Sequence, residues 1–349
     1  MIVPRMDTQA REGAAAEVFH CAVDLPIAAV PSGVQAVRSA VRGCLVALLR
    51  GVGDAHALPM VVAELLENAV RHGDWSRRGR IEVRIEASAS GSRVEVGNPV
   101  VPDGEGVRGL RRALDALARH SSPVAAYCAQ VHRMSIGPGD PCELGLARIA
   151  YEGDCDVQAA LEPPDRLRVS ATTRARAGVP AFCSARPAGP GGSPWVHLRI
   201  PNAWQNSELV RVSVGLLAQA ALGPGDHAHC LGMASGELLE NAFKYGDPSA
   251  VEYTLCRVPG ALQIEVRQRP SDRAACDRLA ALIEWIASFG DLRAAYQSRM
   301  QQLSGGGEPG GLGLVRIAYE GGCRLGCALD EAGRVCVRAQ YPIGGSEEA

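Results

Sequence analysis

The chain has 349 residues, a formal net charge of −2 at pH 7 and an apolar fraction of 47%. This composition is typical of globular domains and disfavours a disordered or fibrous chain, and the near-neutral charge disfavours a nucleic-acid-binding protein. No apolar run is long enough to cross a bilayer, and the chain does not start with a secretory signal. We therefore expect a cytoplasmic protein that binds neither nucleic acid nor membrane.

In chain order, the first half begins after a loose tail over residues 1–16 and extends to residue 176. Hydrophobic periodicity and turn signals predict its elements. They are a strand over 17–27, helices over 34–50 and 55–72, hairpin strands over 81–87 and 93–96, helices over 109–119 and 122–134, a helix opening in the segment 143–153, and strands over 156–161 and 167–172. Proline and glycine then cluster over 177–194, which we interpret as a linker.

The same order returns in the second half, residues 195–343, before a short tail over 344–349. Its predicted elements are a strand over 195–200, helices over 207–222 and 226–245, hairpin strands over 251–257 and 261–267, helices over 273–289 and 292–303, a glycine loop opening a helix over 311–322, and strands over 324–329 and 334–340. ELLENA occurs in both halves, and LGLARIAYEG matches LGLVRIAYEG. Matched landmarks lie about 170 residues apart, which indicates a tandem duplication. Each copy is α+β, with a mostly antiparallel sheet that helices cover on one face.

The 12 cysteines are scattered along the chain. Cys323 and Cys327 form the only close pair in the second half, and no other pair stands at the spacing of a zinc site. We therefore expect reduced, mostly buried thiols. Neither zinc nor haem is expected.

The most informative stretch is GELLENAFKYGD in the second half. Glu237 and Asn241 are four residues apart, so on a helix they lie on one face, one turn from each other. An Asn oxygen suits Mg²⁺, and a nearby carboxylate can hold or deprotonate a metal-bound water. Gly246 is expected to end the helix as a left-handed cap. A lone E-x-x-x-N is usually a solvated helix face, but its two copies, each followed by a hairpin and a loop, favour a site or its remnant.

These motifs together resemble a known family. An E-x-x-x-N helix, a β-hairpin, an irregular segment and a G-x-G loop that opens a helix is the layout of the histidine-kinase-like (GHKL) ATPase superfamily. The resemblance covers nearly all of both halves and is closest to bacterial anti-sigma factor kinases and SiaB-type protein kinases. It implies two tandem Bergerat-type α/β sandwich domains that pack as an intramolecular pseudo-dimer.

The resemblance also implies a site for ATP and Mg²⁺. In the second half, Asn241 would ligate Mg²⁺ and Glu237, as the catalytic carboxylate, would hold a metal-bound water. Lys244, the only lysine in the chain, would reach phosphate. Its compact ammonium is not interchangeable with the guanidinium of the many arginines. The glycine loop, which comprises Gly311, Gly313 and Leu314, would bring backbone N–H groups to phosphate. The corresponding residues of a degenerate first site are Glu64, Asn68 and Gly145, with Asn98 matching the Gly-Asn of the SiaB-type kinases.

Both halves depart from the family at its adenine-reading D-x-G-x-G box. The second half has RQRPSDR there, without glycine, and the first half has VEVGNPV, in which Asn98 before Pro99 is also a strong turn signal. The first half has Glu143 where the second has Gly311, so the second half keeps the better site.

Two functions follow from the resemblance for a bacterial signalling regulator. One is an ATP-dependent Ser/Thr kinase that acts on a small regulatory protein, such as an anti-sigma antagonist or a SiaC-like switch protein. The other is a catalytically inactive pseudokinase that binds such a partner without nucleotide turnover.

Overall fold

The fold is described here from a computed structural model, over residues 17–27, 31–52, 56–76, 79–137, 141–174, 194–305 and 311–343. The predicted tails (1–16 and 344–349) and all of the predicted linker except residue 194 lie outside these ranges. The strands are β1 (Phe19–Ile27), β2 (Gly79–Ser88), β3 (Gly91–Pro99), β4 (Cys155–Glu162), β5 (Arg166–Thr173), β6 (Val196–Ile200), β7 (Val251–Val258), β8 (Ala261–Gln268), β9 (Arg324–Leu329) and β10 (Val335–Pro342). Over the described ranges they form a single ten-stranded sheet, in the order β4-β5-β3-β2-β1-β6-β7-β8-β10-β9.

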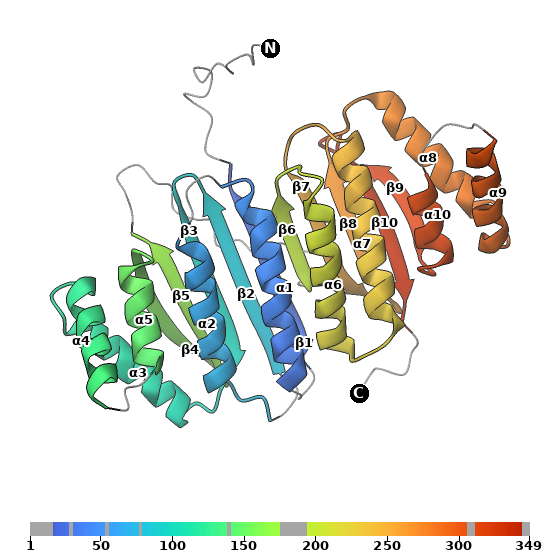
Figure 1. Ribbon diagram of the computed structural model, residues 1–349. Helices are drawn as coiled ribbons and strands as arrows, with labels where there is room; N and C mark the ends of the chain where they lie inside the picture. The colour runs from blue at the N-terminus through green and yellow to red at the C-terminus, as the bar shows by residue number, and fades with distance from the viewer. Residues whose placement is uncertain are drawn as a thin grey trace, which may run out of the picture.

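Helices cover one face of this sheet (Figure 1). They are α1 (Pro31–Leu49), α2 (Leu58–His72), α3 (Glu105–Ala118), α4 (Pro123–Ile136), α5 (Pro141–Tyr151), α6 (Asn206–Leu222), α7 (Asp226–Tyr245), α8 (Arg273–Ala287), α9 (Leu292–Ser304) and α10 (Leu312–Tyr319). The predicted α+β class, antiparallel sheet and order of elements are confirmed. Within the described ranges, no helix combines the length and the apolar character that crossing a membrane requires.

Three local predictions were wrong. Helix α3 begins at Glu105 rather than near residue 109, because Gly104 supplies an extended N-cap and Val107 already packs in the core. Gly246 caps α7 with φ −86° and ψ 163°, which is extended and not left-handed. The chain leaves α7 in this direction because Gly246 then pairs with Pro270 beyond β8. Asn98 is not a turn residue, since β3 continues to Pro99 and Asn98 pairs with Leu167.

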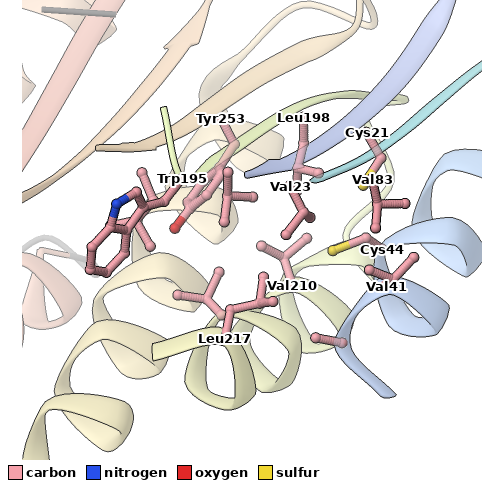
Figure 2. Packing of buried hydrophobic residues seen from close by; sticks show 14 of the residues in the cluster. Cys21, Val23, Val41, Cys44, Val83, Trp195, Leu198, Val210, Leu217 and Tyr253 are labelled. Atoms are coloured by element: carbon pink, nitrogen blue, oxygen red, sulfur yellow. The ribbon is translucent and has the colours of Figure 1, made fainter. Parts of the chain in front are cut away.

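The two halves meet at the centre of the sheet. The sequence predicts a sheet in each half, and the structure joins the strands of both into one. Strands β1 and β6 pair antiparallel, from His20 opposite Arg199 to Val23 opposite Val196. Each would otherwise be an unprotected edge strand. Helices α1 and α6 pack together over this junction, where Cys44, Val210 and Leu198 lie in a shared core (Figure 2).

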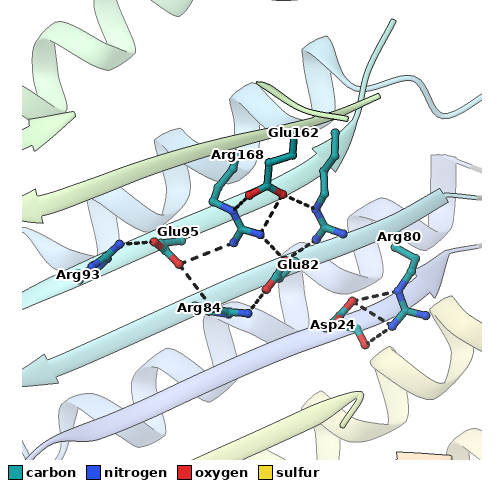
Figure 3. A network of polar contacts seen from close by, with 9 residues as sticks. Asp24, Arg80, Glu82, Arg84, Arg93, Glu95, Glu162 and Arg168 are labelled. Atoms are coloured by element: carbon teal, nitrogen blue, oxygen red, sulfur yellow. Dashed lines mark hydrogen bonds and ion pairs between the residues drawn. The ribbon is translucent and has the colours of Figure 1, made fainter. Parts of the chain in front are cut away.

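Residues of β1 alternate between the two faces of the sheet. Cys21, Val23 and Leu25 point to the helices and are fully buried, whereas His20 and Asp24 lie on the face without helices. The same period of two continues in β2, where Ile81, Val83 and Ile85 are buried beneath helices. The helix-free face is therefore polar and carries ion pairs between neighbouring strands (Figure 3).

A pair of histidines marks the junction of the halves on this polar face. His20 Nε2 and His197 Nδ1 are 2.7 Å apart, and the two rings are stacked with centroids 4.5 Å apart. A hydrogen bond between two ring nitrogens needs one donor and one acceptor, so the ring that accepts is neutral. Burial, then the neighbouring His197 and Arg199, lower the pKa of His20 from 6.5 to about 3. Burial also lowers the pKa of His197.

This pair makes stability depend on pH. A His whose folded pKa is depressed stabilises the fold fully above its unfolded pKa of 6.5, and this contribution is lost as the pH falls toward the folded value. We expect the free energy of unfolding to fall by about 2 kcal/mol between about pH 8 and about pH 5. Urea unfolding at these pH values measures the change. His20→Leu should flatten the dependence and exposed His132→Leu should not; equal slopes for wild type and His20→Leu would contradict the assignment.

Candidate functional site

Helix α7 carries the ELLENA motif of the second half and is fixed to the sheet by its buried side. Leu238, Leu239 and Ala242 are buried. The hydroxyl of Ser235 lies 2.8 Å from that of Tyr253 on β7, and both groups are buried. Because this side of the helix faces the sheet, Glu237 and Asn241 face the neighbouring α10 and the space beside it.

Gly311 opens α10 as the sequence predicts, whereas Gly313 and Leu314 already lie within that helix. Gly311 is the N-cap of α10 and has φ 77°, a left-handed conformation that favours glycine. A Cβ on Gly311 would lie 2.6 Å from Leu282 Cδ2 and 3.3 Å from Arg299 Nη2. The turn therefore brings bare backbone next to a guanidinium at a helix N-terminus, which is an arrangement suited to an anion.

Glu237 is held by an arginine of α10. Its Oε1 accepts a hydrogen bond from Arg316 Nη1 at 2.7 Å, and Arg316 Nε also donates to Glu320 at 3.2 Å. Gly313 packs directly against Oε2, where a side chain on residue 313 would collide with the carboxylate. Burial raises the pKa of Glu237, and the Arg316 guanidinium partly opposes that shift. The carboxylate is thus half-buried and already ion-paired.

The first half repeats this arrangement. Glu64 Oε1 accepts from Arg148 Nη1 at 3.2 Å, and Arg148 Nε donates to Glu152 at 2.9 Å. A Cβ on Gly145 would lie 2.7 Å from Glu64 Oε2. Asn68 is buried, and its Nδ2 has no hydrogen-bond partner among the described residues. The Glu–Arg pairing is therefore a feature of both copies and not a peculiarity of one.

A cavity of about 310 Å³ opens in the second half between α7, α8, α10 and strands β8 and β10. Its size is at the lower end of the range of small-molecule sites, about 300–1,000 Å³. The wall is mostly apolar, and among the described residues its polar side chains include those of Asn241, Tyr245, Gln268, Arg278 and Arg299. Gly311 and Leu314 also line it. Three predicted residues, Asn241, Gly311 and Leu314, therefore meet at one cavity.

Two further predicted residues lie elsewhere. Lys244 is exposed, is not among the residues lining the cavity, and its Nζ lies 5.0 Å from the centroid of the Tyr245 ring. Asn98 in the first half is 2% exposed, and its Nδ2 donates to the Pro99 carbonyl at 3.1 Å. Helix α3 of the first half corresponds to α8 of the second. Its side chains Val107, Leu110 and Ala113 are buried in the core.

Comparison of the chain with protein-family models, with curated proteins and with solved structures finds no match.

Gln268, Arg278 and Arg299 line the cavity but are not among the site residues that the sequence predicts. Gln268 is the counterpart of Asn98, because each stands two residues after the valine in the matching segments VEVGN and IEVRQ. This match was visible in the sequence and could have placed Gln268 beside the site. Nothing local in the sequence indicates that Arg299 of α9 returns to Gly311, since that contact depends on how α9 packs against α10.

The residues present fit a nucleotide better than they fit a metal held by carboxylates. The cavity joins an apolar compartment to a glycine turn with a cation beside it, which suits a base and a phosphate respectively. Within the ranges that the structure describes, no three His, Cys, Asp or Glu side chains gather into a group that could hold a metal ion. Of the expected metal residues, Asn241 lines the cavity, whereas Glu237 is ion-paired with Arg316.

Proposed function

We propose that this chain is a bacterial cytoplasmic signalling regulator with two divergent ATPase-like domains, and that its second half binds an adenine nucleotide. The observation that carries the proposal is the cavity on which Asn241, Gly311 and Leu314 converge. The GHKL resemblance supports the choice of ATP, because the E-x-x-x-N helix and the glycine loop are the motifs through which that family holds it. In this proposal the first half has a structural or partner-binding role.

Each group at the cavity has a distinct task in this proposal. The backbone at the start of α10 and the Arg299 guanidinium beside Gly311 hold phosphate oxygens. Asn241 would offer a neutral oxygen to Mg²⁺, which would neutralise phosphate charge. The apolar walls from α7, α8 and β10 exclude water from the base.

The same geometry favours binding over turnover. A carboxylate that activates a hydroxyl or a water must have an oxygen available to accept the proton. Glu237 gives Oε1 to Arg316 and packs Oε2 against Gly313, and Glu64 is held in the same way by Arg148. We therefore propose that nucleotide binding, without turnover, changes the affinity for a small regulatory partner.

ATP-dependent Ser/Thr phosphorylation of the partner is the second candidate. The observation that favours it is the raised pKa of Glu237, which burial causes. A raised pKa makes a carboxylate a better proton acceptor. This function requires the Glu237–Arg316 pair to open when substrate binds.

Calorimetric titration with Mg-ATP and a non-hydrolysable analogue tests the proposal. We expect the wild type to bind and Asn241→Ala to bind at least about tenfold more weakly, because a polar contact in the cavity is lost. The matched change in the other half, Asn68→Ala, should leave the affinity within about twofold of wild type, since the two sites are far apart in the sheet. No binding by wild type, or equal binding by the wild type and Asn241→Ala, would refute a nucleotide site here. In a separate assay of turnover, release of ADP from Mg-ATP by the wild type, together with its loss in Glu237→Gln, would favour the kinase.

A further inference from the structure

Strand β9 forms one end of the sheet and β4 forms the other (Figure 1). Within the described residues each of them pairs on one side only, β9 with β10 and β4 with β5. The other side of an edge strand offers its backbone N–H and C=O groups to a further strand. Residues 325–329 of β9 include neither a charged residue nor a proline, which are common devices against such pairing.

The direction of the backbone groups of β9 follows from the turn that ends it. The Asp330 N–H donates to the Arg334 carbonyl at 2.9 Å, so it points toward β10. Alternate residues of an antiparallel strand face the same neighbour, so Leu325, Cys327 and Leu329 direct their N–H and C=O groups away from β10. A second β9, placed antiparallel about a two-fold axis at Cys327, would match these groups. The two Cys327 residues would face each other and Leu325 would face Leu329 of the second copy, in about six hydrogen bonds.

The side chains at the ends of β9 carry opposite charges in this arrangement. Arg324 is exposed, and it lies on the same face of the sheet as Asp330, because the two are an even number of residues apart. Asp330 accepts from Arg334 Nε at 2.8 Å, which holds its carboxylate at the turn. In the two-fold arrangement, Arg324 of each copy would stand opposite Asp330 of the other. Opposite charges across two strands are favourable, and like charges are unfavourable.

Strand β4 at the other end of the sheet provides an internal comparison. The segments EGDCD and EGGCR align the two edge strands, so that Asp156 corresponds to Arg324 and Glu162 to Asp330. The same two-fold arrangement of β4 would therefore set Asp156 against Glu162 of the second copy, and these two carboxylates repel. A head-to-tail pairing of β4 with β9 would combine one attractive and one repulsive end contact. Of these three pairings, β9 with itself is the one in which both end contacts attract.

We propose that β9 is a dimerisation edge, at which two copies of this chain join their sheets antiparallel about a two-fold axis at Cys327. The chain already joins its own halves by an antiparallel pairing, between β1 and β6, with α1 and α6 on the same face of the sheet. A two-fold pairing is closed, whereas a head-to-tail pairing continues as a fibre. Because β4 carries like charges in the corresponding register, assembly ends at two chains.

Sedimentation equilibrium of the full chain tests the inference, with a reductant present so that cysteine cross-links do not contribute. At about 50 µM the wild type should have the mass of two chains. Arg324→Asp gives β9 the charge pattern of β4 and should weaken the dimer at least about tenfold, since two attractive contacts become repulsive. Arg111→Asp makes the same charge change at an exposed residue of α3 and should leave the affinity within about twofold of wild type.

Three results of this experiment would overturn the inference. One is a wild type with the mass of a single chain, which would mean that the edge of β9 stays unpaired or is covered by another segment of the same chain. Another is a mass that grows beyond two chains with concentration, which would indicate head-to-tail pairing of β4 with β9. The third is a folded Arg324→Asp variant that dimerises as tightly as Arg111→Asp.

A substitution of the backbone donor separates the hydrogen bonds from the charges. Cys327→Pro removes an N–H group that points away from β10, so the ladder to β10 should remain while the mass falls to that of one chain. Cys327→Val keeps this N–H and should dimerise like the wild type, and cooperative thermal unfolding confirms that each variant is folded. A folded Cys327→Pro that dimerises like Cys327→Val would place the contact elsewhere on the molecule and overturn the inference.

Discussion

Replacement of Gly311 by valine is expected to abolish nucleotide binding by the second half, with affinity falling at least about 100-fold. Gly311 has φ 77°, and its missing Cβ leaves room for Leu282 and Arg299 to approach the turn that opens α10. A valine there would push Leu282, occupy the cavity beside Asn241 and move the Arg299 guanidinium away from the helix N-terminus. The phosphate contacts and the space for the ligand would be lost together.

Strain at a positive φ is a separate effect and needs its own control. A residue other than glycine in the left-handed region costs about 1–2 kcal/mol. Gly333, in the turn before β10, has φ 72°, and a Cβ there would meet nothing within 4 Å. Gly333→Val should therefore lose similar stability in urea unfolding but bind Mg-ATP like the wild type. If a folded Gly311→Val variant binds as tightly as Gly333→Val, then the glycine turn is not part of the site.

Much of the fold could be predicted from local patterns. The period of two in VEYTLCR and ALQIEVR predicted β7 and β8, and the repeat of ELLENA aligned α2 with α7. The joining of both halves into one sheet could not be predicted from local patterns, because it depends on a pairing between β1 and β6 that are distant in the sequence. Asn98 was misplaced because a turn signal in Asn-Pro was overridden by the ladder between β3 and β5.

The candidate site was only partly visible in the sequence. Spacing on one helix correctly placed Glu237 and Asn241 on the same side of α7, and the glycine loop opens α10 as expected. Arg316 also stands in the sequence at the position that Arg148 has in the first half, but only the packing of α10 on α7 puts it 2.7 Å from Glu237. The cavity could not be anticipated, since it reflects how α8 sits over β8 and β10.

Loss of the Glu82 carboxylate is expected to have the largest effect on stability, with Glu82→Leu lowering the free energy of unfolding by about 3–5 kcal/mol. The Glu82 side chain on β2 is 2% exposed on the face without helices, beneath arginines of β2 and β5. It forms ion pairs with Arg166 at 2.5 Å, with Arg168 at 3.2 Å and with Arg84 (Figure 3). Removing this carboxylate leaves several partly buried guanidinium groups without their shared counter-charge.

Glu162 on the edge strand β4 provides the matched control, because it contacts two of the same arginines from a more exposed position. Its side chain is 40% exposed and lies 2.7 Å from Arg168 and 3.9 Å from Arg166. Glu162→Leu should therefore cost about 1 kcal/mol or less, as exposed ion pairs do. Urea unfolding, in which the denaturant carries no charge, compares the two variants. Equal losses of unfolding free energy would mean that the arginines are solvated independently of Glu82. The burial of Glu82 would then not contribute to the stability of the face without helices.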